Sequence, residues 1–198
     1  MAAGAKRFPS AATVRGSLTA RRPRTILVRV FVLGIDPGLS RCGYCVLEVD
    51  DRRGRNNGRA VALGVLRTDP DRELPLRLAE LWDDFVGLLD EFPVSAVAVE
   101  RVLFQVNVRT AMGVGQASGI VMAEAAKRGL PVAQYSPNQV KDAVAGFGSA
   151  DKTQVQRMVQ MLLDLPEPPN PPDAADAAAV ALTYVALSSG APVPKVHT

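Results

Sequence analysis

The chain has 198 residues, 47% of them apolar and 22% charged, a balance typical of one globular domain. No run of 18 apolar residues exists, so we expect no transmembrane helix and no membrane partner. The net charge is +3, but residues 1–24 hold six of the 23 basic residues and no acid, which leaves 17 basic against 20 acidic residues. Net charge therefore does not indicate nucleic-acid binding, which would need a local basic patch.

Few residues are suited to covalent catalysis or to binding metals through nitrogen or sulfur. The only histidine is His197, beside the C-terminus, which argues against a Ser-His-Asp or Cys-His mechanism. Cys42 and Cys45 form a C-x-x-C pattern, but in a strand this spacing places the two thiols on opposite faces. We therefore expect reduced, buried thiols, and hydrolytic chemistry based on carboxylates and metal ions.

Residues 1–27 show no periodicity and mix Ala, Ser, Thr, Pro and Arg. A basic, acid-free leader is typical of an organellar transit peptide, of a disordered arm, or of a translation start assigned too early. We favour the last two interpretations, because the fold is predicted to begin at Val28.

A buried strand is predicted next. Six apolar residues lie between Val28 and Ile35 and four are β-branched, as in strands covered on both faces. Asp36-Pro37-Gly38 ends the strand, because proline removes a ladder donor and glycine turns the chain. The Asp36 carboxylate is then expected at the carboxyl end of a central strand, where α/β proteins bind ligands. The simpler alternative is an Asx turn that ends the strand.

Two further strands, over residues 41–49 and 59–67, are predicted to continue as an antiparallel meander, joined by a turn. A helix is predicted over residues 74–92 and ends before Pro93. Its apolar positions recur every three or four residues: Leu74, Leu78, Leu81, Phe85, Leu88, Leu89 and Phe92.

Residues 94–99, Val-Ser-Ala-Val-Ala-Val, are predicted to form a buried strand that runs into Glu100. A strand, a helix and a strand in this order form a right-handed crossover, so we expect parallel pairing with the strand that ends at Asp36. Glu100 then lies at the same end of the sheet as Asp36. An exposed acid at a strand end is the simpler interpretation, since a buried Glu needs a partner.

Residues 107–128 are predicted to form a helix that contains Gly113, Gly115 and Gly119. This spacing resembles part of a dinucleotide-binding fingerprint, which requires its glycines directly after a strand. Close helix packing, against the sheet or against a second copy of the chain, is the better interpretation.

The remaining segment is predicted to contain one strand, over residues 131–135, and three helices. The first helix covers residues 136–144. Ser149 is expected to cap the second helix, and the last helix is expected to run from Asp173 to Leu187.

Asp173-Ala-Ala-Asp176 opens the last helix, and a spacing of three places both carboxylates on one face. Capping of the helix N-terminus is the simpler interpretation of this pair. Together with Asp36 and Glu100, however, the pair makes four carboxylates that can converge only with a counter-charge. Oxygen ligands without His or Cys select Mg²⁺ or Mn²⁺, and two such ions about 4 Å apart support phosphodiester cleavage.

Nine short motifs follow one another along the chain: Gly34-Ile-Asp-Pro-Gly38, Gly43-Tyr44, Val99-Glu-Arg-Val102, Asn107, Gly115-Gln116, Gln139-Val-Lys141, Gly148-Ser-Ala-Asp-Lys152, Gln154-Val155 and Asp173-Ala-Ala-Asp-Ala177. In this order and at this spacing they resemble the RuvC family of bacterial Holliday-junction resolvases. The resemblance implies a ribonuclease-H-like α/β domain over residues 28–187, with a five-stranded mixed sheet flanked by helices. Residues 1–27 and 188–198 are then expected to be a disordered leader and tail.

The resemblance also implies a homodimer in the bacterial cytoplasm that binds four-way junction DNA and makes symmetric paired nicks during DNA recombination and repair. The RuvA–RuvB branch-migration complex is the implied partner. Asp36, Glu100, Asp173 and Asp176 match the family's catalytic acids, which implies two Mg²⁺ ions per active site, with Mn²⁺ able to substitute. Water activated by the metal would attack the phosphorus in line and leave a 5′-phosphate.

Further residues are expected at the DNA. Lys141 and Lys152 match basic family residues at the DNA backbone, and lysines beside acids would offset phosphate repulsion; ordinary surface lysines are the alternative. Arg101 is expected at the same surface. The family commonly has an aromatic residue where this chain has Leu103, and Phe104 follows, so either side chain is a candidate for contact with an unpaired base.

Two other functions remain open at this point: a ribonuclease-H-like nuclease that acts on structured RNA, and a junction-binding protein without catalysis. A sugar kinase or actin-like ATPase would need a second similar domain, and the chain is too short for one.

Overall fold

The computed structural model describes residues 29–50, 58–101 and 108–188. A five-stranded sheet lies at its centre, formed by β1 (Arg29–Asp36), β2 (Arg41–Asp50), β3 (Gly58–Arg67), β4 (Val94–Glu100) and β5 (Val132–Tyr135). The helices are α1 (Leu74–Glu91), α2 (Val108–Lys127), α3 (Pro137–Ala145), α4 (Lys152–Leu162) and α5 (Pro172–Ser188). None of these helices is both long and apolar enough to cross a membrane.

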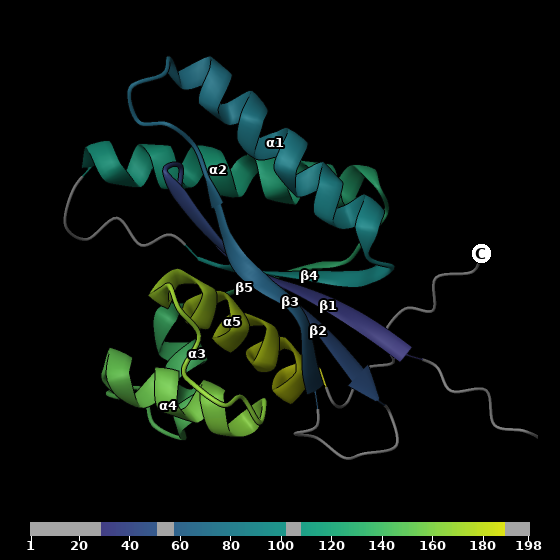
Figure 1. Ribbon diagram of the computed structural model, residues 1–198, viewed down its shortest axis with the longest axis vertical. Coiled ribbons are helices and arrows are strands. Elements are labelled where there is room, and N and C mark those ends of the chain that lie inside the picture. The colour runs from purple at the N-terminus through teal and green to yellow at the C-terminus, as the bar shows by residue number, and fades with distance from the viewer. Residues whose placement is uncertain (1–28, 51–57, 102–107, 189–198) are drawn as a thin grey trace, which may run out of the picture.

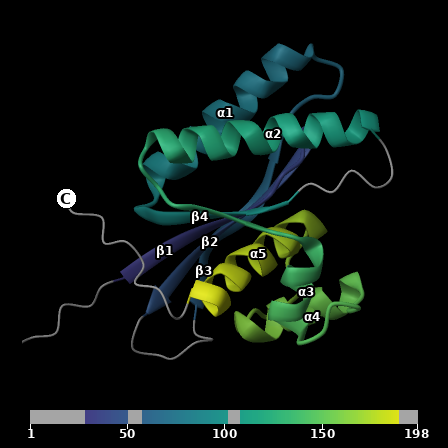
Figure 2. The ribbon, with the colours of Figure 1, turned by 180° about the vertical axis from the view of Figure 1, so that it is seen from behind.

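The helices form a layer on each face of the sheet (Figure 1). Helices α1 and α2 cover one face, and α5 lies on the other face with α3 and α4 outside it. The view from behind shows the same three layers (Figure 2). The domain is thus the flanked mixed sheet that the sequence predicts.

The strand order is β3-β2-β1-β4-β5. Strand β2 pairs antiparallel with β1 and β3, whereas β4 runs parallel to β1, and β5 runs parallel to β4. The predicted meander and parallel crossover are therefore confirmed. Because β1 and β4 are parallel neighbours, their last residues, Asp36 and Glu100, lie at the same end of the sheet, which we call the acidic end.

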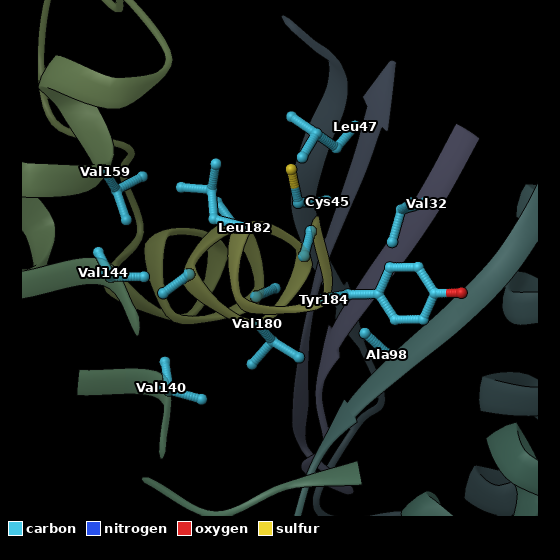
Figure 3. Packing of buried hydrophobic residues seen from close by; sticks show 14 of the residues in the cluster. Val32, Cys45, Leu47, Ala98, Val140, Val144, Val159, Val180, Leu182 and Tyr184 are labelled. Atoms are coloured by element: carbon cyan, nitrogen blue, oxygen red, sulfur yellow. The ribbon is translucent and has the colours of Figure 1, made fainter. Parts of the chain in front are cut away.

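The core consists of two apolar clusters, one on each face of the sheet. Cys45 belongs to the cluster beneath α5, and Cys42 to the cluster beneath α1 and α2. Both thiols are free and buried, as the alternation of a strand predicts. Figure 3 shows the first cluster, in which Val180 and Leu182 of α5 lie among side chains of the strands and of α3 and α4.

Helix α5 lies unusually close to the sheet because two strand glycines face it. A Cβ atom on Gly34 would lie 2.3 Å from the carbonyl oxygen of Ala177, and one on Gly43 would lie 2.1 Å from that of Asp173. Real Cβ atoms do not approach an oxygen this closely. The absence of two side chains thus lets the first turn of α5 rest on β1 and β2.

Three details of the predicted helices are wrong. Asp151, not Ser149, caps α4: its carboxylate accepts the Gln154 N–H at 2.8 Å, and the Gln154 side chain accepts the Asp151 N–H at 2.8 Å. This reciprocal capping box needs Gln or Glu three residues after the cap, which Ser149 lacks. Helix α5 begins at Pro172, so Asp173 lies in its first turn rather than at its cap. Leu74 is 41% exposed, so the buried stripe of α1 begins later.

Candidate active site

Asp36 and Glu100 form the sheet-borne half of the acidic end. The two carboxyl groups lie close enough for the charge of Glu100 to act on Asp36. Burial raises the pKa of Asp36 to about 8, and the negative charges of Glu100, Asp176 and Asp173 add to this shift. Burial and the charge of Asp176 also raise the pKa of Glu100. A proton on Asp36 therefore removes the repulsion that the two carboxyl groups would exert on each other if both were ionised.

The first turn of α5 supplies the other half of the acidic end. Asp173 and Asp176 lie one turn apart on this helix, which crosses the ends of β1 and β2. Their charges act on Asp36, so the structure brings all four predicted acids into one neighbourhood. The three-residue spacing on one helix face, together with the parallel β1–β4 pair, accounts for this arrangement.

Two cations engage the carboxylates of α5. Arg41 Nη2 donates to Asp173 Oδ2, and Lys152 Nζ donates to Asp176 Oδ2 at 2.7 Å. Burial alone would lower the pKa of Lys152, but the bond with Asp176 and the charges of Asp36 and Asp173 raise it. Lys152 is therefore held in its charged form within the acidic end.

The donor set suits a hard divalent cation, because it offers carboxylate oxygens and no nitrogen or sulfur ligand. A cation would also relieve the repulsion that raises the pKa of Asp36. Within the ranges that the structure describes, however, no three His, Cys, Asp or Glu side chains lie close enough to hold a metal ion. The bonds of Asp173 to Arg41 and of Asp176 to Lys152 direct these two carboxylates towards other partners.

The remaining predicted residues differ in position. Lys141 on α3 lies near enough to Glu100 to lower the pKa of that carboxyl. Arg101 directly follows β4, and its backbone N–H donates to the Tyr135 carbonyl at 2.7 Å. Arg101 is exposed to solvent. Leu103 and Phe104 lie outside the described residues.

Arg41 is the site residue that the sequence analysis missed. It opens β2 two residues before Gly43, and alternation along a strand places both residues on the face that α5 covers. That alternation is the signal in the sequence that places Arg41 on the same face as Gly43, whereas its pairing with Asp173 depends on the position of α5.

The turn after Asp36 is tied to α1 and to the end of β3. Thr68 Oγ1 donates to the Leu39 carbonyl at 2.6 Å, and Arg77 donates to Thr68 Oγ1 at 3.0 Å and to Ser40 Oγ at 2.5 Å. Thr68 is buried, which makes these bonds strong constraints. The segment between Asp36 and Arg41 is therefore fixed by hydrogen bonds to Thr68, which follows β3, and to Arg77 of α1.

With this geometry established, comparison with known proteins identifies the family. The family model described as crossover junction endodeoxyribonuclease RuvC matches residues 32–184. The chain belongs to the RuvC family. RuvC of Leifsonia xyli subsp. xyli is 51% identical over 153 residues, covering 77% of this chain and 72% of that protein. RuvC of Salinispora arenicola is 52% identical over 154 residues, covering 78% of this chain and 86% of that protein.

Solved structures agree with this assignment. RuvC of Thermus thermophilus in complex with Holliday junction substrate matches with a TM-score of 0.75 and 37% identity, over 80% of this chain and 94% of that chain. The yeast mitochondrial Holliday junction resolvase Ydc2 is 19% identical, with a TM-score of 0.58 over 80% and 78% of the two chains, and shares the fold. The predicted RuvC resemblance and ribonuclease-H-like fold are confirmed.

Proposed function

We propose that this protein is a crossover junction endodeoxyribonuclease that resolves Holliday junctions by symmetric paired nicks during recombination and repair. The observation that carries the proposal is the convergence of four carboxylates, from β1, β4 and α5, at one end of the sheet. Membership of the RuvC family and the likeness to a RuvC bound to Holliday junction substrate support it.

The four acids Asp36, Glu100, Asp173 and Asp176 are the proposed catalytic metal ligands, in a family of metal-dependent nucleases. Their all-oxygen chemistry favours two Mg²⁺ ions, with Mn²⁺ as a substitute. When bound, such ions supply an activated water and a counter-charge for the leaving oxygen. Asp36 and Glu100 contribute from neighbouring strands, which hold their spacing rigidly.

Metal binding would change the contacts of the α5 residues. One oxygen of each carboxylate is engaged by a cation, Asp173 Oδ2 by Arg41 and Asp176 Oδ2 by Lys152, so these bonds would shift as the carboxylates turn towards a bound ion. Lys152 would then face the incoming phosphate as a cation, and Arg41 would face the DNA backbone beside it. Together with Lys141 and Arg101, they offset the repulsion between the DNA backbone and the acids.

The proposed homodimer forms through α2. Nothing lies within 4 Å of a Cβ placed on Gly115 or Gly119, and Met112 on the same helix is 60% exposed. Ala123 is also exposed, so these residues, three or four apart, form an apolar stripe. A second α2 can approach such a stripe closely, which gives the two active sites needed for paired nicks. The RuvA–RuvB complex is the proposed partner, in the cytoplasm.

The experiment is nicking of a synthetic four-way DNA junction by wild type and Asp36→Asn, with and without Mg²⁺. We expect paired, Mg²⁺-dependent nicks from wild type, and binding without nicking from the variant. Nicking by Asp36→Asn at the wild-type rate would contradict the proposed site. Trimming of structured RNA without junction cleavage would indicate a ribonuclease. Tight junction binding without nicking in Mg²⁺ or Mn²⁺ would indicate a binding protein, with Leu103 and Phe104 as the next residues to vary.

A further inference from the structure

Two arginines border the acidic end of the sheet on the side away from Glu100. Arg41 opens β2 and Arg67 ends β3, and the two are direct partners in the antiparallel ladder. Directly opposed residues of such a ladder project from the same face, with Cβ atoms about 4.5–5.5 Å apart. That face is the one covered by α5, because Arg41 bonds to Asp173 and Gly43 faces the same helix turn.

Like charges placed directly opposite each other destabilise a sheet. Asp173 compensates Arg41, but Arg67 is exposed and forms no ion pair with any acid in the described ranges. The acid nearest to it in the chain, Asp69, uses its carboxylate to accept the Asp71 N–H at 2.9 Å, within the turn after β3. At the border of the acidic end, the guanidinium of Arg41, which pairs with Asp173, thus lies beside that of Arg67, which pairs with no acid in the described ranges. This arrangement suits an anionic ligand.

We propose that Arg41 and Arg67 bind a backbone phosphate of the cleaved DNA strand, one or two nucleotides from the phosphate that is cut. This inference rests on the proposed nuclease function. Strands lie about 4.8 Å apart, so Arg67 on β3 lies two strands, or roughly 10 Å, from Asp36 on β1. Successive phosphates of a DNA strand are about twice the 3.4 Å axial rise apart, because the backbone also winds around the axis, so that distance corresponds to one or two nucleotides.

Guanidinium groups are suited to this task because their planar donors match a phosphate with two parallel hydrogen bonds. Lys152 bonds to Asp176, and Lys152 and Lys141 both act on the charge of Glu100, whose strand β4 lies on the other side of β1 from the arginine pair. The DNA strand would therefore be held by cations on both sides of the cleaved bond. A strand anchored on both sides is fixed in position and direction relative to the acids.

The first test is binding of a labelled four-way junction in EDTA, at several salt concentrations, so that cleavage plays no part. Arg67→Ala should weaken binding five- to twentyfold near 0.1 M salt and reduce the slope of log affinity against log salt by about 0.9, the value for one lost phosphate contact. Arg67→Lys should keep the slope. Arg59→Ala is the matched control, because Arg59 is exposed at the other end of β3 and pairs with Glu48; its affinity and slope should equal those of wild type.

The second test locates the contact with junctions that carry one uncharged methylphosphonate, placed one to five nucleotides from the cleavage site. Wild type should lose affinity at a position one or two nucleotides away, and Arg67→Ala should lose nothing further there. Wild-type nicking in Mg²⁺ is measured alongside. Normal nicking with the same salt slope and methylphosphonate pattern for wild type and Arg67→Ala would overturn this inference alone. A wild type that neither binds nor nicks the junction would overturn the proposed function, and this inference with it.

Discussion

The substitution Gly43→Ala tests how the sheet positions the acids of α5. The added Cβ would lie 2.1 Å from the Asp173 carbonyl oxygen and 3.3 Å from the Ala177 Cβ, whereas real Cβ contacts begin at about 3.0 Å. The obstacle at 2.1 Å is backbone, so no rotation of a side chain relieves it. The first turn of α5 must therefore withdraw from β2 by about 1 Å, and Asp173 moves with it.

Both stability and activity should fall. Overpacking of this kind costs about 1–3 kcal/mol, and in a domain of this size a loss of about 2 kcal/mol lowers Tm by roughly 4–8 °C. A displacement of about 1 Å in a catalytic group costs on the order of a hundredfold in rate. Thermal unfolding measures the first effect, and junction nicking under single-turnover conditions, well below the Tm, measures the second.

Gly87→Ala is the matched control. Gly87 lies within α1, and nothing stands within 4 Å of a Cβ placed there. Alanine is the better helix former by up to about 1 kcal/mol, so this variant should melt at or above the wild-type temperature and nick normally. A Gly43→Ala protein with wild-type Tm and wild-type nicking would refute the claim that close contact at Gly43 positions α5.

Three further predictions concern other parts of the structure. In metal-free buffer the wild-type Tm should fall as pH rises from about 4 to 8, because folded Asp36, with its raised pKa of about 8, keeps a proton that the unfolded chain releases above pH 3.8. In the Asp36→Asn variant the Tm should depend less on pH, and at pH 8 it should exceed the wild-type Tm. The same dependence of Tm on pH in both proteins would contradict the raised pKa of Asp36. Thr68→Val removes the hydroxyl that donates to the Leu39 carbonyl and accepts from Arg77. Urea unfolding should therefore show a free energy of unfolding lower by about 1–3 kcal/mol. An unchanged free energy of unfolding would show that these hydrogen bonds do not stabilise the fold. Gly119→Glu should yield a folded monomer by sedimentation at micromolar concentration, whereas wild type should be a dimer; a monomeric wild type would exclude dimerisation through α2 at that concentration.

Much of the fold follows from the sequence because its strands are short and apolar and because Pro or Gly residues mark several of their boundaries. Pro37 and Gly38 mark the end of the run before Asp36, and Pro93 marks the start of the run before Glu100. The order of strand, helix and strand then determines that β1 and β4 are parallel, and hence that the two acids lie together. The proximity of Asp36 and Glu100 could therefore be predicted from the sequence alone.

What the sequence did not reveal depends on three-dimensional contacts. The cap of α4 is an exception, because Gln154, three residues after Asp151, already distinguishes Asp151 from Ser149 in the sequence. The pairing of Arg41 with Asp173 joins residues 132 positions apart, a separation at which no local pattern reports contact. The glycines that admit α5 have the same limitation, since their closest contacts lie on a helix near the other end of the chain.

The burial of α5 has a consequence for the motions of the protein. Ten consecutive or near-consecutive residues of this helix, from Ala174 to Tyr184, are buried between the sheet and the outer helices α3 and α4. Such an element opens only when the whole domain unfolds, so its amide hydrogens should be among the slowest to exchange with solvent. Asp173 and Asp176 are carried by this helix, and they cannot drift apart from Asp36 through local opening. A helix buried in this way thus keeps Asp173 and Asp176 beside the strand acids Asp36 and Glu100 between one encounter with DNA and the next.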